Sequence, residues 1–207
     1  MSTETNELTV QGVVAVLTAS QLIARARVID EVFHSVMKNG IHYGTIPGCG
    51  DKPALFKGGA EKLQATFGIA SEIVVSDLSM ADEIRYRVES RATSIASGAY
   101  LGSGVGECSS SEEKYRWKKA ANDKEYDATP DDRKRVKWAN GKTGAYAIKQ
   151  VRTNPADVAN TVLKMAAKRG RVDMTLTVLG CSDLFTQDFD EDDPTEPVAE
   201  PKAPLKE

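Results

Sequence analysis

The sequence predicts an α+β fold that combines a small antiparallel β-sheet with a long α-helix, with another helix before the sheet and an acidic tail at the end. Three short strand-like runs follow one another between residues 72 and 108. A strong helix start at Asn154-Pro155 then opens a long amphipathic segment. At 207 residues the chain can bury one self-sufficient core, so we expect one domain over residues 1–187 and a tail over residues 188–207.

The first predicted helix begins near Thr18 or Ser20, either of which can cap it, and stops at Asn39-Gly40. Residues 1–16 carry no cap or turn and could be a loose arm or a first strand. Within the helix, apolar residues recur at intervals of three and four, which predicts one buried face. The residues of this face are Leu22, Ala26, Ile29, Phe33 and Val36.

Residues 41–59 are rich in glycine and proline and predict a loop or a short hairpin. Glycines beside Lys52 and Lys57 could let a phosphate approach the backbone closely. The chain contains no GxxxxGK[ST] motif, so we expect no site for a nucleoside triphosphate. Residues 60–67 predict a short helix with Leu63 and Phe67 on one side.

Three runs, residues 72–77, 84–97 and 98–108, predict the antiparallel sheet. In the middle run the apolar residues alternate with charged ones, as in a strand with one buried face. The last run is punctuated by four glycines. The alternating apolar residues are Ile84, Tyr86 and Val88.

The long helix has Asn154 as its cap, Pro155 at its first position and Asp157 in its first turn, and it ends at Gly180. Its predicted apolar face comprises Val158, Val162, Met165, Val172, Leu176 and Leu179. A second stripe has the spacing and chemistry of a surface that follows phosphates, although an ordinary solvent-facing side would look the same. This stripe comprises Thr161, Lys164, Lys168, Arg171 and Thr175.

The net charge of −3 hides an uneven distribution along the chain. Residues 112–171 carry 16 basic and 8 acidic side chains, whereas residues 188–207 carry 2 basic and 8 acidic ones. A strongly basic segment is the electrostatic footprint of nucleic-acid binding, and the acidic tail masks it in the total.

Residues 109–141 predict an exposed, basic excursion from the core, because their apolar content is low. We expect a short helix after Ser109 to Glu113 and then a charged loop through Asp131 to Trp138. Its cations can bind phosphates and its aromatic rings can stack on bases; alternatively, it is a solvated loop whose tryptophans belong to the core. The candidate DNA-binding residues here are Lys114, Arg116, Trp117, Lys118, Lys119, Arg133, Lys134, Arg135, Lys137 and Trp138.

The sequence predicts no cofactor and no metal site. Cys49, Cys108 and Cys181 lie far apart without a CxxC pair, and His34 and His42 are too separated to suggest a metal or nucleophile system. The acidic clusters lie in solvent-seeking segments, whereas a two-metal nuclease holds its carboxylates on rigid elements. We therefore expect a binding protein without covalent chemistry rather than an enzyme.

The sequence also predicts no contact with a membrane. No apolar run approaches the roughly 20 residues of a membrane-spanning helix. The polar start, Met1 to Glu7, is unlike a secretion signal. We expect a cytoplasmic location.

Three stretches carry a resemblance to a known family. They are His42-Tyr43-Gly44 through Glu61-Lys62-Leu63, Glu89 through Ser109 with its Gly-Ser-Gly-Val-Gly run, and Asn160 through Asp188. The likeness spans residues 20–190 and resembles phage-encoded recombination proteins of the Rad52-like single-strand annealing superfamily. One departure concerns the helix: the basic pair Lys168-Arg169 lies about three turns before Gly180, where the family has about two.

The resemblance implies a curved antiparallel sheet packed on a long helix, and subunits that associate edge to edge into rings or helical filaments. It places DNA in a basic groove and extends DNA contact to Lys168 and Arg169. The implied function is ATP-independent binding of single-stranded DNA and annealing of complementary strands in phage recombination and repair, in the host bacterial cytoplasm.

Two other functions stay open at this stage: a nuclease or nuclease subunit of a recombination system, and a protein-binding factor that acts on the host. The acidic tail also has alternatives. It could bind a host single-strand binding protein or a partner exonuclease, compete with DNA for the basic groove, or only aid solubility.

Overall fold

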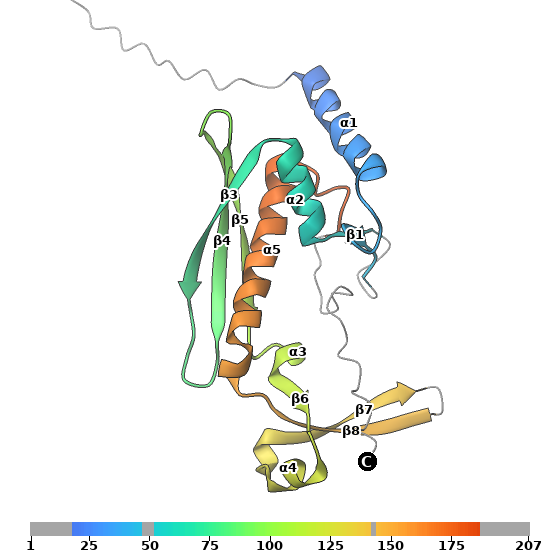
Figure 1. The fold of residues 1–207 in the computed structure, drawn as a ribbon, viewed down its shortest axis with the longest axis vertical. Helices are drawn as coiled ribbons and strands as arrows, with labels where there is room; N and C mark the ends of the chain where they lie inside the picture. The colour runs from blue at the N-terminus through green and yellow to red at the C-terminus, as the bar shows by residue number, and fades with distance from the viewer. Residues whose placement is uncertain (1–17, 47–51, 142–143, 187–207) are drawn as a thin grey trace, which may run out of the picture. The chain divides into compact units, whose positions relative to one another are not determined.

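The computed structural model describes residues 18–46, 52–141 and 144–186 (Figure 1). The chain divides into two compact units, residues 1–36 and residues 37–207. The predictions for residues 1–16, for Cys49 and for the tail over residues 188–207 lie outside the described residues.

The first unit contains helix α1, Ala19–Ser35. Thr18 caps it, as predicted. The Thr18 hydroxyl accepts a hydrogen bond of 3.3 Å from the Gln21 backbone N–H, and the Gln21 side chain accepts one of 2.8 Å from the Thr18 backbone N–H. This reciprocal pair is a capping box. The predicted stop at Asn39-Gly40 is wrong, because the helix ends at Ser35.

The predicted buried face of α1 is also wrong in part. Ile29 and Val32 are the buried residues, whereas Leu22 and Val36 are exposed. Apolar residues occur on several sides of this helix, since Ile23 is exposed as well. The three-and-four spacing therefore did not select a single face.

In the second unit, the predicted antiparallel sheet is confirmed. It has the strand order β3-β4-β5, with Val75 opposite Val88 and Val88 opposite Gly106. The predicted alternation holds on the central strand, where Val88 is buried and Arg87 is exposed. The strands are β3 (Ile69–Asp77), β4 (Arg85–Ser94) and β5 (Tyr100–Ser109).

The long C-terminal helix is confirmed as well. Helix α5, Ala159–Leu179, follows a 3₁₀ turn, η2, at Pro155–Val158, and runs along the sheet (Figure 1). The Asn154 side chain accepts a hydrogen bond of 3.1 Å from the Ala156 backbone N–H, and Gly180 closes the helix with a φ of 64°. Of the predicted apolar face, four residues are buried and Val158 and Met165 are partly buried. The four are Val162, Val172, Leu176 and Leu179.

Helix α5 contacts the backbone of β5 directly, because glycines of β5 face the helix there. A Cβ atom on Gly104 would lie 2.0 Å from the Met174 nitrogen, and one on Gly106 would lie 2.2 Å from the Gly170 nitrogen. Only hydrogen atoms fit at these positions. The glycines that punctuate β5 in the sequence therefore allow the close packing of helix on sheet.

Between residues 43 and 66, the described residues contain a short pair of strands and the predicted short helix. Strands β1 (Tyr43–Gly44) and β2 (Ala54–Leu55) pair antiparallel, and helix α2 spans Lys57–Thr66. The Gln64 amide on α2 donates a hydrogen bond of 2.7 Å to the Thr175 hydroxyl on α5, and both residues are buried. The prediction that Thr175 extends the polar stripe is therefore wrong, because α2 covers it.

The predicted charged loop is also wrong: residues 117–152 contain a second antiparallel sheet with the order β6-β8-β7. Lys118 and Lys119 lie in a strand and not in the predicted short helix. The hairpin of β7 and β8 extends away from α5 (Figure 1). The elements are α3 (Glu113–Arg116), β6 (Trp117–Lys119), α4 (Asp123–Ala128), the 3₁₀ turn η1 (Asp131–Arg133), β7 (Lys134–Gly141) and β8 (Gly144–Arg152).

Strand β8 leads almost directly into the long helix. Only Thr153 and Asn154 lie between the end of β8 and the start of η2. The Thr153 N–H donates a hydrogen bond of 3.0 Å to the Arg116 carbonyl oxygen, so the connection is also tied to α3.

Within the three described ranges, no helix has both the length and the hydropathy that crossing a membrane requires.

Candidate nucleic-acid interface

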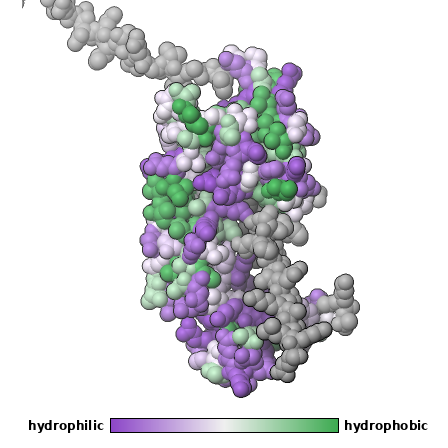
Figure 2. All heavy atoms as spheres, viewed as in Figure 1, coloured by the Kyte–Doolittle hydropathy of each residue, from purple (hydrophilic) through white to green (hydrophobic). Residues whose placement is uncertain are grey.

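A basic hollow of about 450 Å³ lies on α5, and we call it the α5 hollow. Lys164, Lys168 and Arg171 occur at intervals of four and three, so they share one helix face. Lys57, the first residue of α2, adds a fourth cation from a distant part of the sequence. Hydrophilic side chains run along this part of the molecular surface (Figure 2). The remaining lining residues are Thr161, Met165 and Ala167.

Among the described residues, the Glu61 carboxylate pairs with two cations of the α5 hollow, Lys57 and Arg171. The Glu61 Oε1 atom lies 3.5 Å from the Lys57 ammonium and 3.4 Å from an Arg171 guanidinium nitrogen. Such exposed pairs contribute little, and one carboxylate does not neutralise Lys57, Lys164 and Arg171 together. Lys164 is exposed and has no carboxylate partner among the described residues. The α5 hollow therefore keeps an excess of positive charge.

Arg169, the fourth predicted cation of α5, does not line the α5 hollow. Its guanidinium donates to both carboxylate oxygens of Glu112, at 2.7 and 2.9 Å, and to the Glu107 carbonyl oxygen at 2.6 Å. Burial tends to raise the pKa of Glu112, but its bond to Arg169 outweighs this and lowers the pKa below its ordinary value. Arg169 thus ties α5 to β5 and to the start of α3, which is a structural role.

The Glu112 carboxylate also affects the ionisation of the Cys108 thiol. Burial, followed by the neighbouring Glu112 carboxylate, raises the pKa of its thiol to about 12. The thiol is therefore protonated at neutral pH and not a nucleophile.

The second sheet has one face on which cations and aromatic rings are interleaved. Residues directly opposite each other in antiparallel strands share a face, and alternate residues share it along each strand. Trp117 lies opposite Arg152, and Gln150 lies between Lys119 and Arg135 in the next row. We call this the basic face, and it carries Trp117, Lys119, Arg135, Lys137, Tyr146 and Arg152.

The lysines on the opposite face have local partners. Lys118 lies 3.7 Å from Glu125, Lys134 lies 3.1 Å from Asp131, and Lys149 lies 2.9 Å from Asp123. These acids belong to α4 and η1, which follow β6. Two of the predicted DNA-binding cations, Lys118 and Lys134, are therefore partly neutralised within the protein.

Arg135 is held in place on the basic face. Its guanidinium pairs with the Glu113 carboxylate and lies 4.4 Å from the centre of the Trp117 ring. The pair with Arg135 lowers the pKa of Glu113. Trp117 is half-buried under this guanidinium, which reduces its capacity to stack on a base.

Trp138 on β7 is different, because 70% of its surface is exposed. It lies on the opposite face from Trp117, opposite Ala147, and Tyr146 on β8 is exposed as well. Exposed aromatic rings of this kind can stack on unpaired bases. The β7–β8 hairpin thus presents an aromatic side chain on each of its faces.

The predicted site residues are divided between several separate surfaces of the protein. The α5 hollow gathers Lys164, Lys168 and Arg171, and the second sheet carries the residues from β6 and β7. Lys114 and Arg116 lie on α3, each within 5.8 Å of a neighbouring aromatic ring, Tyr115 and Trp117 respectively. Arg133 ends η1 and lines a separate hollow.

Three residues were missed as site residues. The glycines beside Lys57 favoured a phosphate near it, but no sequence signal placed Lys57 beside Lys164. Arg152 and Tyr146 lie on β8, a strand that was not predicted. The alternation of Tyr146, Ile148 and Gln150 with Ala147 and Lys149 is a weak strand signal that could have revealed it.

No protein-family model matches the chain, and neither the curated proteins nor the solved structures contain a significant match to it.

Proposed function

We propose that this protein binds single-stranded DNA and anneals complementary strands without ATP, as a phage-type member of the Rad52-like superfamily. The observation that carries the proposal is the α5 hollow, in which Lys57, Lys164 and Arg171 outnumber Glu61, the carboxylate that pairs with two of them among the described residues. A surface of this charge suits a phosphate backbone. The basic face and the exposed Trp138 add contacts that do not depend on base sequence.

The proposed mechanism is physical and needs no covalent step. Lysine and arginine side chains neutralise the phosphates of one strand, which lowers the repulsion that a second strand meets. Base pairing then supplies the free energy of annealing. Neither step uses a nucleophile, a metal or a nucleotide cofactor.

Self-association is part of the proposal, and β3 supports it. Nothing among the described residues pairs with the outer edge of β3. Ile73 and Val75 on this strand are each 43% exposed, and a hydrophobic patch covers β3 (Figure 2). Open strand edges with apolar side chains favour pairing with another chain. The β3 edge is thus our proposed contact between subunits of a ring or filament.

The setting that we propose is phage homologous recombination in the bacterial cytoplasm. A host single-strand binding protein or a partner exonuclease would then be a partner. These elements rest on the sequence resemblance alone.

The test is annealing of two complementary oligonucleotides, one of them labelled, by the purified protein without ATP or metal, at low and moderate salt. We expect faster duplex formation with no loss of strand. Lys57→Gln and Lys164→Gln should each reduce the salt dependence of single-strand binding, with the log–log slope falling by about 0.7 per lost phosphate contact.

Lys62→Gln is the matched control, because Lys62 is an exposed lysine of α2 that does not line the α5 hollow. No DNA binding and no annealing by the wild-type protein would refute the proposal. Magnesium-dependent degradation of the strands would favour a nuclease instead.

A further inference from the structure

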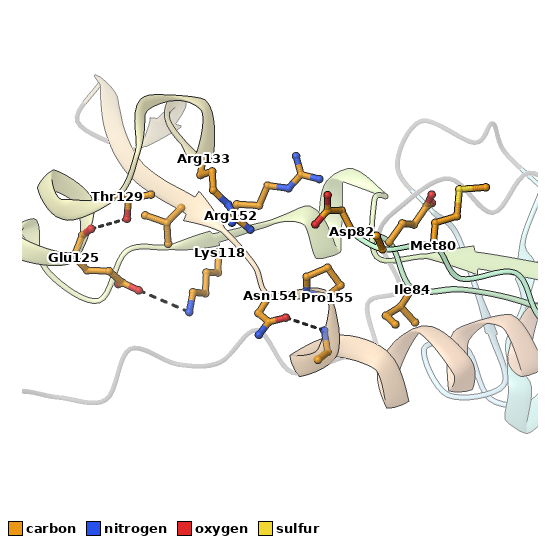
Figure 3. Close-up of a pocket in the computed structure, with 14 residues that line it drawn as sticks. Met80, Asp82, Ile84, Lys118, Glu125, Thr129, Arg133, Arg152, Asn154 and Pro155 are labelled. Atoms are coloured by element: carbon orange, nitrogen blue, oxygen red, sulfur yellow. Dashed lines mark hydrogen bonds and ion pairs between the residues drawn. The ribbon is translucent and has the colours of Figure 1, made fainter.

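A second hollow, separate from the α5 hollow, lies where the β3–β4 connection meets the second sheet. It encloses about 450 Å³ and is lined by Lys118, Arg133 and Arg152 from the second sheet and its connections. Residues 80–84 form the opposite wall, and Asn154 to Ala156 at the start of η2 form its base. Figure 3 shows Arg133 and Arg152 next to each other in this hollow.

The two guanidinium groups are available to a ligand. Arg133 and Arg152 also line a smaller adjoining hollow together, and neither has a carboxylate within 4.0 Å among the described residues. Like charges at close quarters repel each other, and an anion placed between them relieves the repulsion. Two guanidinium forks present the planar sets of N–H donors that match phosphate oxygens.

Two of the three acidic side chains of this hollow form ion pairs. Glu83 pairs with Arg85 at 2.8 Å, and Glu125 pairs with Lys118 at 3.7 Å and accepts a hydrogen bond from the Ala121 N–H. Asp82 lies near the two arginines in Figure 3 without an ion pair to either. Asp132 lines the smaller adjoining hollow and likewise forms no ion pair with either arginine. Arg133 and Arg152 are therefore the cations here whose guanidinium groups are unpaired among the described residues.

The rest of the lining suits the remainder of a nucleotide. Met80, Ile84 and Pro155 provide an apolar wall beside the arginines. The Asn154 amide has its oxygen occupied by the Ala156 N–H, which leaves its NH₂ group as a donor. A volume of about 450 Å³ lies in the range typical of small-ligand sites.

We propose that Arg133 and Arg152 form a second clamp for nucleic acid, in which they hold one backbone phosphate while its sugar or base lies against Met80, Ile84 and Pro155. This inference rests on the proposed function and assigns Arg152 a role in it. It gives the protein two separate points of attachment to a strand, one on α5 and one on the second sheet.

The experiment measures the affinity of the full-length protein for a labelled single-stranded oligonucleotide over a series of salt concentrations. Arg133→Gln and Arg152→Gln should each weaken binding several-fold at low salt and reduce the log–log slope by about 0.7, the loss of one phosphate contact. The double variant should lose no more slope than either single variant, because both arginines hold the same phosphate. Arg152→Lys should retain the slope but bind less tightly, because lysine keeps the charge without the fork.

Lys124→Gln is the control, since Lys124 is an exposed cation of α4 that lines neither hollow. Thermal unfolding of each variant shows whether its fold is intact. An unchanged slope and affinity in the folded double variant, with Lys57→Gln and Lys164→Gln still weakening binding, would overturn the second clamp alone. That result would favour an acidic protein partner as the ligand of Arg133 and Arg152. Loss of DNA binding by the wild-type protein would overturn the proposed function and this inference together.

Discussion

The Asp173 carboxylate on α5 accepts a hydrogen bond of 2.8 Å from the Val105 backbone N–H on β5. Val105 belongs to an edge strand, so its N–H would otherwise face solvent. Two residues along, the Glu107 carbonyl oxygen accepts from Arg169. Side chains of α5 thus occupy backbone groups on the outer edge of β5, whereas no such partner covers the outer edge of β3 in the described residues.

This asymmetry predicts which edge supports self-association. Val75→Lys should shift the protein to smaller species in light scattering coupled to size exclusion, because a charged side chain on an open strand edge opposes pairing. Val105→Lys is the matched change on the outer edge of β5, where side chains of α5 bind the backbone. It should leave the assembly unchanged, although Val105 is 52% exposed. Equal effects of the two substitutions would argue against β3 as the contact.

Gly106→Ala should destabilise the fold strongly. The added methyl group would lie 2.2 Å from the Gly170 nitrogen and 2.3 Å from the Ala166 carbonyl oxygen, so α5 would have to move away from β5. We expect a loss of about 1–3 kcal/mol or more in the free energy of unfolding, measured with urea. Gly58→Ala in α2 is the control: its nearest contact would be 3.4 Å, and alanine favours a helix by about 0.5–1 kcal/mol. A stable Gly106→Ala protein would contradict the close packing described above.

Glu112→Gln should reduce stability by about 2 kcal/mol at neutral pH, which is less than for a fully buried pair because both side chains are about one-quarter exposed. The pKa of Glu112 is lowered in the folded protein, so its contribution is complete above the ordinary value near 4.5 and is lost as pH falls through the folded value. The difference between wild type and variant should therefore shrink in acid, as denaturant titrations at several pH values would show.

Glu113→Gln is the comparison for Glu112→Gln. Its pair with Arg135 is more exposed, so we expect a loss below about 1 kcal/mol. If Glu113→Gln lowered the free energy of unfolding more than Glu112→Gln, the pair between Glu112 and Arg169 would not be the more stabilising of the two.

Trp138→Ala should weaken single-strand binding with little effect on stability. Stacking on one base contributes roughly 1–3 kcal/mol, and Trp138 is too exposed to contribute much to the core. Trp117→Ala should show the opposite pattern, because Trp117 packs under the Arg135 guanidinium. Fluorescence anisotropy and thermal unfolding of both variants separate the two effects. A Trp138→Ala protein with unchanged affinity would remove this residue from the interface.

The elements that the sequence predicted are those with strong local signals. The Thr18 cap, the Asn154-Pro155 start, the Gly180 stop and the alternation in β4 depend on neighbouring residues. The second sheet was missed because it is held by ion pairs from its strands to α3 and α4 and by ring contacts, such as Arg135 with Trp117, between residues distant in the sequence. Low apolar content then suggested a loop.

The candidate site was predicted to a similar degree. The stripe of Lys164, Lys168 and Arg171 follows from helical periodicity, and these residues line one hollow. Two features of α5 depend on tertiary contacts: the hydrogen bond between Thr175 and Gln64 and the ion pair between Arg169 and Glu112. Charge and spacing in the sequence could not reveal these contacts.

The short connection between β8 and η2 has a mechanical consequence. With only Thr153 and Asn154 between them, and with Thr153 bonded to Arg116, the strand and the helix cannot turn independently without breaking the Asn154 cap or the bond to α3. We therefore expect a force applied to the β7–β8 hairpin to be transmitted to the first turn of α5.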